Sequence, residues 1–234
     1  MHIRFALALF FVFLSNVSLL AQTDSTQGSY SSEPQKKKWY TTRGGDAALV
    51  SFSDVSRNGT GLNNVPRFTF FLNGGYNFNR DLSNHFGFFT GFNGKNLGVI
   101  YDSSDQVRFK HRVLMLGVPV GLKVGNLKKG NFVFFGAQAD FAYNYKEKRF
   151  VDGEKVSKFN EWFSKRTPIF MPSVFAGFRT NKKVGLKAQY FPNNFFKPGF
   201  EKNGVKPYAG MKASVFFLTL SYDFSMREFV SGAK

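Results

Sequence analysis

Hydrophobic and polar residues alternate along most of the chain. In the segment 107–124, apolar side chains occupy every second position, and polar or small residues lie between them. One face carries Leu114, Leu116, Val118, Val120, Leu122 and Val124, and the opposite face carries His111, Met115, Gly117, Gly121 and Lys123. A period of two residues is typical of a β-strand with two different faces, so this segment predicts a strand.

Eight segments with this pattern follow one another. They are residues 46–53, 66–78, 85–101, 107–124, 131–145, 167–180, 184–191 and 206–224. Inside the third segment the apolar positions change parity, from Phe86 and Phe88 to Leu97 and Val99, which predicts a β-bulge near Gly94. Pro119, Pro168 and Pro172 interrupt other strands, and each removes a backbone donor, so we expect bulges or lumenal polar partners there.

The connections between these segments alternate in length. Short connections lie at 79–84, 126–130 and 181–183, and between them are 54–65, 102–106, 146–166 and 192–205, of which three are long. Outer-membrane barrels combine tight periplasmic turns with longer outer loops. The sequence therefore predicts an all-β fold, an eight-stranded antiparallel up-and-down transmembrane β-barrel with both termini on the periplasmic side.

The two ends of the chain indicate export. Residues 1–21 combine a short positive start with a ten-residue apolar run, which is too short for a membrane-spanning helix and predicts a signal peptide cleaved near Ala21. Residues 22–45 are polar and predict a flexible periplasmic lead-in, residues 46–224 the barrel, and residues 225–234 a periplasmic tail. The expected location is the outer membrane of a Gram-negative bacterium.

The composition fits a barrel whose outside is apolar. The chain has 32 Phe among 234 residues, spread at alternate positions rather than gathered in one core. The inward faces then carry a polar network, for which we expect Arg67, Lys123, Gln138, Asp140, Arg179, Lys187 and Asp223. Eight strands enclose a space that side chains fill, and buried charges require partners, so we expect Asp140 and Asp223 to pair with inward Arg and Lys.

The net charge of +17 indicates an anionic partner. Export argues against nucleic acid and favours a phosphate-bearing lipid surface. Arg108, Lys110 and Arg112 continue the outward face of 114–124 beyond its apolar part, so we expect them to contact lipid A phosphates; the alternative is that they are ordinary solvated charges. The loop 146–166 mixes cations with aromatic residues and suggests a binding surface for other envelope proteins, with a short helix at 156–165.

The closing segment, Ser214 to Phe224, is similar to the last strand of known outer-membrane barrels. Together with the export signal and the Phe-rich hairpins, it resembles the PorT-type barrels of Bacteroidetes-like bacteria and, more loosely, the small OmpA-like barrels. The resemblance implies that an aromatic residue near the end, here Phe224, helps the barrel-insertion machinery recognise the chain. It also points towards type IX secretion.

Catalytic chemistry finds little support in the sequence. Cysteine is absent, no metal-ligand or phosphate-binding motif is present, and His85 and His111 are the histidines that follow the signal. We therefore expect no catalytic residue, no metal and no cofactor, and a non-enzymatic barrel that serves as a structural element or a partner anchor. The alternatives are a soluble periplasmic calycin-like barrel that binds an apolar ligand, and a lipid A-modifying enzyme with His111 as its base.

Overall fold

The computed structural model describes residues 39–69, 74–181 and 184–229. The expected signal peptide 1–21, residues 22–38 of the expected lead-in and residues 230–234 lie outside these ranges. The strands are β1 (Trp39–Arg57), β2 (Thr60–Gly61), β3 (Asn63–Asn64), β4 (Arg67–Thr69), β5 (Gly74–Asp81), β6 (Phe86–Ser104), β7 (Val107–Asn126), β8 (Asn131–Val151), β9 (Glu154–Trp162), β10 (Phe170–Arg179), β11 (Val184–Phe191) and β12 (Met211–Phe229). Within the described ranges, no helix is long and apolar enough to cross a membrane.

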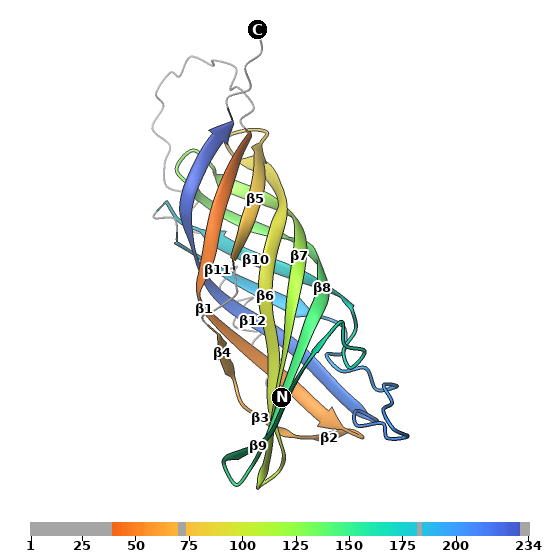
Figure 1. The fold of residues 1–234 in the computed structure, drawn as a ribbon. Helices are drawn as coiled ribbons and strands as arrows, with labels where there is room; N and C mark the ends of the chain where they lie inside the picture. The colour runs from red at the N-terminus through yellow and green to blue at the C-terminus, as the bar shows by residue number, and fades with distance from the viewer. Residues whose placement is uncertain (1–38, 70–73, 182–183, 230–234) are drawn as a thin grey trace, which may run out of the picture. The chain divides into compact units, whose positions relative to one another are not determined.

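The strand pairings run round a ring (Figure 1). Strand β1 pairs with β4 and β5, β5 with β6, β6 with β7 and β7 with β8. The pairing continues from β8 to β10, β11 and β12, and β12 pairs with β1 along its length. Every pair is antiparallel, and the pairing returns to the strand where it began. The fold is an eight-stranded up-and-down barrel in which β4 and β5 share one position in the wall and β9 is an additional arm.

The barrel begins and ends beyond the limits expected from the sequence. Strand β1 starts at Trp39, inside the segment 22–45 expected to be flexible, and β12 runs to Phe229, beyond the expected limit at 224. These two residues are Cα partners in the pairing of β1 with β12. The Trp39 ring packs edge-on against Phe88 and lies under the Arg80 guanidinium, and these contacts hold the first residue of β1 against its neighbours.

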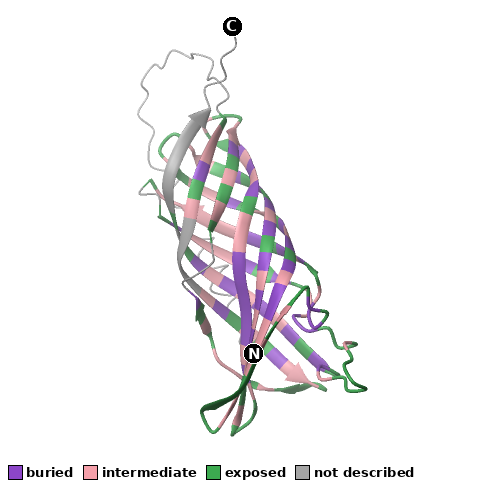
Figure 2. Ribbon diagram, in the orientation of Figure 1, coloured by how far each residue is buried: buried purple, intermediate pink, exposed green. Residues whose placement is uncertain are grey.

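The two faces of the wall have opposite character, as the alternation predicted. Figure 2 shows buried and exposed residues alternating along the upper strands. Large apolar side chains are exposed on the outside, among them Phe52, Phe68, Phe92, Leu116, Val120, Phe135, Phe141, Val174 and Leu220. Polar side chains are buried inside, among them Ser51, Lys95, Lys123, Gln138, Asp140, Ser173, Gln189 and Thr219. The predicted direction of the phenylalanines in this part of the barrel is confirmed.

The expected bulge at Gly94 is wrong. Strand β6 keeps one register with β7 from Phe86 to Asp102, so no parity change occurs near Gly94. Leu97 and Val99 point inward because this end of the barrel has an apolar interior. A register shift lies instead between β7 and β8, at Leu114 and Met115, opposite Ala142 and Asn144. It turns Tyr145 into the interior, although the sequence placed this residue on the outward face with Tyr143.

Pro119 and Pro172 lie in strands with no register shift beside them, and Pro168 precedes β10. The pairing of β6 with β7 skips two positions between Thr90↔Val120 and Asn93↔Gly117, next to Pro119, and then resumes in the same register. The Thr90 hydroxyl donates to the Pro119 carbonyl at 2.8 Å. The missing donor therefore interrupts the ladder locally but does not shift its register.

The segment 146–166 forms strands rather than the expected helix. Strand β8 continues to Val151, and β9 returns beside it from Glu154 to Trp162. The turn between them is Asp152-Gly153, with φ of 50° and 83°, which matches the Asp-Gly preference of a type I′ hairpin turn. The helix-like spacing of Phe159 and Trp162 was misleading because the turn decided the conformation.

The interior at the end with long connections is an apolar core. Its buried residues come from the strands and from the segment between β11 and β12; they include Leu97, Val99, Val113, Met115, Met171, Phe195, Phe196, Tyr208, Met211 and Phe217. Phe195 and Phe196 are fully buried, and the backbone N–H of Phe195 donates to the Ala213 carbonyl at 2.9 Å. The connection 192–210 thus contributes side chains to the interior.

Candidate functional site

A hydrogen-bonded polar cluster lies at mid-height in the lumen. Asp140 is fully buried and accepts hydrogen bonds from Gln138 Nε2 at 2.5 Å and Ser173 Oγ at 2.8 Å. Its Oδ1 lies 3.5 Å from Lys95 Nζ. Lys95 also donates to Gln189 Oε1 at 2.7 Å, and Gln189 Nε2 donates to Ser173 Oγ at 2.6 Å. Residues from four strands, β6, β8, β10 and β11, therefore close a cycle across the lumen, which we name the central network.

A second polar group lies near the short turns. Lys123 Nζ is 2.6 Å from Asp81 Oδ1, 2.7 Å from the Tyr40 hydroxyl and 3.3 Å from Asn79 Oδ1. This cation is 1% exposed, and three strands, β1, β5 and β7, supply the group. Between it and the central network, the rings of Phe89, Phe134 and Phe175 pack together and separate the two groups.

The other residues expected in the lumen have separate surroundings. Arg67 donates to the carbonyl of Asn96 at 3.1 Å and to its Oδ1 at 2.8 Å. Lys187 Nζ lies 5.7 Å from the centre of the Phe175 ring, and Arg179 is half-buried at the end of β10. Asp223 lies in β12 opposite Gly44, but its side chain is outside the described part.

The expected set is thus divided among several places, and the sequence reading missed three members of the central network. Lys95 was missed because a bulge at Gly94 would have turned it outward. Ser173 and Gln189 share the inward parity of their segments, which was the available signal.

Glycine makes room for these interior groups. A Cβ on Gly117 would lie 1.9 Å from Gln138 Nε2 and 2.4 Å from Asp140 Oδ1, and a Cβ on Gly121 would lie 2.5 Å from the Phe89 ring. Gly117 and Gly121 of β7 therefore leave the space that the side chains of Gln138 and Asp140 from β8 and of Phe89 from β6 occupy. The described interior side chains are largely buried, and polar and aromatic groups form alternating layers among them.

His111 lies in the apolar end of the lumen and is 1% exposed. Its Nδ1 lies 2.6 Å from the Tyr145 hydroxyl, which donates to Glu147 Oε2 at 2.8 Å. The Tyr208 hydroxyl also donates to this carboxylate, at 2.9 Å, and the Phe196 ring covers the imidazole edge-on at 4.9 Å. No serine hydroxyl among the described residues hydrogen-bonds to His111. The same residues contain no group of three His, Cys, Asp or Glu placed to hold a metal.

The three cations expected to contact lipid phosphate differ in their surroundings. Arg108 makes two hydrogen bonds to Asp102, at 2.6 and 3.0 Å, and this pairing holds the pKa of the Asp102 carboxyl below its usual value. Lys110 Nζ lies 4.6 Å from the centre of the Phe150 ring. Arg112 Nη2 donates to Asn144 Oδ1 at 3.3 Å. Arg108 is thus neutralised locally, whereas the other two cations have no acidic partner among the described residues.

No protein-family model and no curated protein matches this chain. Among solved structures, it is similar to Ail, the attachment invasion locus protein of Yersinia pestis, with 13% identity, coverage of 81% of this chain and 100% of that one, and a TM-score of 0.35. For Neisserial surface protein A the values are 12%, 80%, 97% and 0.38, and for OprG from Pseudomonas aeruginosa 12%, 81%, 97% and 0.35. The assignment of the fold rests on the chain's own strand pairings.

Proposed function

We propose that this chain is a non-enzymatic outer-membrane β-barrel protein that acts as a structural element or as an anchor for partner proteins. The observation that carries the proposal is the opposite character of the two faces of the wall. Exposed Phe92, Leu116, Val120 and Phe135 suit hydrocarbon, while the buried charge of Asp140 is matched inside. A protein dissolved in water gains nothing from an apolar outer belt and a charged interior.

The proposed orientation places the short turns in the periplasm. Strand β1 begins and β12 ends at that end of the barrel, so both ends of the described chain lie on one side. The longer connections, including the β8–β9 hairpin and 192–210, then face outward. Bacterial barrels of this class have short periplasmic turns and longer extracellular loops.

The filled lumen argues against a diffusion pore. Three groups follow one another along the described interior: the packed rings of Phe89, Phe134 and Phe175, the central network, and the apolar core with Phe195 and Phe196. The same arrangement counts against a calycin-like carrier, because the core around Phe196 is occupied by the chain's own side chains. The buried setting of His111, with a tyrosine rather than a serine as its hydrogen-bond partner, disfavours a lipid A-modifying enzyme. The PorT-type resemblance and its link with secretion stay a hypothesis, in which the β8–β9 hairpin is the surface offered to envelope partners.

Fractionation tests the proposal. The full chain, expressed with its own first 21 residues, is expected in the detergent-extracted outer-membrane fraction, and it should migrate faster on a gel before heating than after heating. Recovery as a monomer in detergent-free buffer would overturn the proposal. In planar bilayers we expect no stable single-channel conductance, and a steady ohmic channel would contradict the filled lumen.

A further inference from the structure

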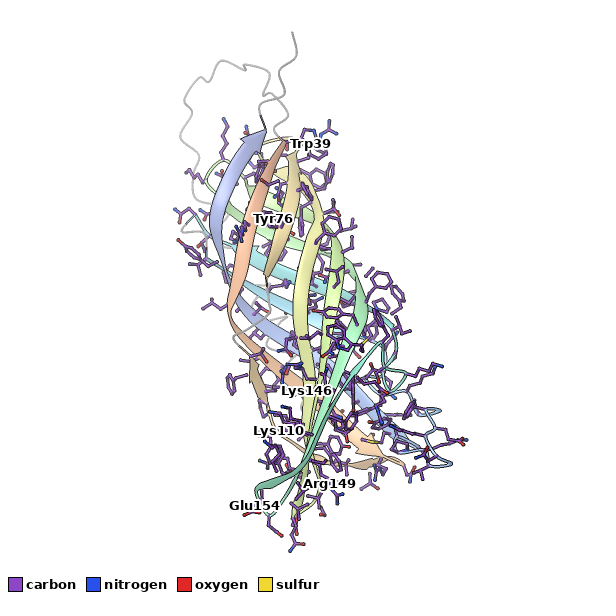
Figure 3. All side chains as sticks on the ribbon, in the orientation of Figure 1. Trp39, Tyr76, Lys110, Lys146, Arg149 and Glu154 are labelled. Carbon is purple, nitrogen blue, oxygen red and sulfur yellow. The ribbon has the colours of Figure 1, made fainter. Side chains whose placement is uncertain are left out.

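Five cations line up across three neighbouring strands on one outer surface. Arg112 of β7 is opposite Lys146 of β8, and Lys110 of β7 is opposite Lys148 of β8, which is opposite Lys158 of β9. Residues directly opposite in an antiparallel sheet share a face, so these side chains form two adjacent rows. We name the five residues the cationic ladder. Figure 3 shows Lys110 and Lys146 along this part of the molecule, with Trp39 at the other end.

Like charges placed directly opposite each other destabilise a sheet, so the ladder has an unfavourable self-energy. The pKa of Lys146 is lowered, first by burial and then by the charges of Lys158, Arg112, Lys148 and Lys155. Among the described residues, Lys146, Lys148 and Lys158 make no ion pair.

The nearby acids are engaged elsewhere. Glu147 accepts hydrogen bonds from Tyr145 and Tyr208 in the interior, Glu161 accepts from Arg166, and Asp102 is paired with Arg108. The hairpin therefore keeps a row of positive charge that its own carboxylates do not neutralise.

The ladder continues directly from an aromatic part of the outer surface. Trp162 is 63% exposed and stacks on Tyr143 at 5.9 Å, and it is the Cα partner of Asn144, two positions before Lys146. Phe141 and Phe170, both exposed, lie against each other at 5.4 Å. Along β8, the outward face thus passes from apolar through aromatic to cationic. A lipid with acyl chains and a phosphorylated head has the same order of groups.

We propose that the cationic ladder binds the phosphate groups of the lipid in the outer leaflet, with the exposed aromatic side chains against its apolar part. The proposal rests on the proposed membrane location. It revises the set expected from the sequence, because Arg108 is bound to Asp102 and three lysines of the hairpin take its place. Binding removes the repulsion between the facing cations, and this favours a ligand with two phosphates over one with a single charge.

The test uses the full chain refolded in a zwitterionic detergent, titrated with diphosphoryl lipid A in the same micelles. Binding is followed by tryptophan fluorescence, to which Trp162, beside the ladder, contributes. The variant K148Q/K158Q removes two facing cations, and K128Q/K129Q removes two exposed lysines from the short turn at the other end of the barrel. Faster gel migration before heating shows that each variant is folded.

Wild type and K128Q/K129Q should bind equally, and K148Q/K158Q should raise the Kd roughly 10- to 30-fold, at about 1 kcal/mol per cation near a lipid surface. Dephosphorylated lipid A should bind the wild type at least as weakly as the phosphorylated lipid binds the variant, because the variant still keeps three of the five cations. Equal Kd values for the two variants, or tight binding of the dephosphorylated lipid, would overturn the proposal. Saturation by pyrophosphate alone, at the same affinity as lipid A, would overturn the assignment to a lipid. The titration does not depend on cellular location, so its failure is distinct from a failure of fractionation.

Discussion

Removal of the carboxylate at Asp140 tests how the buried charge holds the barrel together. The Asp140 and Lys95 charges lie 3.5 Å apart, and at an effective dielectric constant of about 20 their attraction is about 5 kcal/mol. The variant D140N keeps the shape of the side chain but leaves the Lys95 ammonium without its carboxylate. Removal of one partner of a buried ion pair costs about 3–5 kcal/mol, so we expect D140N to lose this much unfolding free energy.

The double-mutant cycle separates this pairing from simple loss of packing. K95M leaves the Asp140 carboxylate without its cation and should also be strongly destabilised. In K95M/D140N both charges are gone, so the double variant should be less destabilised than the sum of the singles, with a coupling of about 3 kcal/mol. The measurement is urea unfolding of the barrel in phospholipid vesicles, followed by tryptophan fluorescence.

D105N is the matched control, because Asp105 lies exposed in the turn between β6 and β7 and its replacement should change stability by less than about 0.5 kcal/mol. The reasoning is refuted if D140N unfolds like D105N, or if the effects of K95M and D140N are additive.

Three further perturbations probe other parts of the molecule. G117V inserts a side chain where a Cβ already meets Gln138 Nε2 at 1.9 Å, so refolding yield on the gel-shift assay should drop sharply, whereas loss of at most a tenth of the yield would contradict the packing described. F196A removes a fully buried ring and should cost about 3–5 kcal/mol and expose 192–210 to limited proteolysis; an unchanged cleavage pattern would count against its role in the core. R108A breaks an exposed pair and should cost at most about 1 kcal/mol, less at high salt. Because Arg108 lowers the pKa of Asp102, this contribution is present above the unfolded pKa of the carboxyl and is lost as the pH falls through the folded pKa. The wild-type advantage should therefore shrink as the solution is acidified, and an advantage that does not depend on pH would contradict it.

The sequence predicted the wall of the barrel because a membrane-facing sheet imposes a strict constraint. Every second residue of 114–124 meets the outside, and the alternation of Leu116, Val120 and Lys123 reports this directly. The short strand expected at 184–191 coincides with β11 for the same reason. The local alternation is enough to predict a strand where all outward side chains meet the same surroundings.

The interior could not be predicted in the same way, since several strands and a connection meet there. The apolar positions change parity after Gly94 because the interior changes there from polar to apolar. The sequence had instead suggested a β-bulge in the backbone. The actual bulge, opposite Leu114 and Met115, leaves no pattern break strong enough to locate it. Phe195 and Phe196 lie in the connection between β11 and β12 but pack in the core. Their burial depends on tertiary contacts that no local pattern reveals. In the hairpin, Asp152-Gly153 is a turn signal that the sequence offered. It proved more informative than the spacing of the aromatic residues, which had suggested a helix.

The pairing of β1 with β12 has a consequence for assembly. The seam joins the first and last strands of the described chain, from Trp39↔Phe229 to Arg57↔Met211, so the cylinder closes only after nearly the whole polypeptide is present. Bringing such distant segments together carries a large loop-closure entropy and slows folding. Until then both strands expose unpaired edges, so the nascent chain needs chaperone protection during transit, and truncation before β12 leaves an open sheet prone to aggregation.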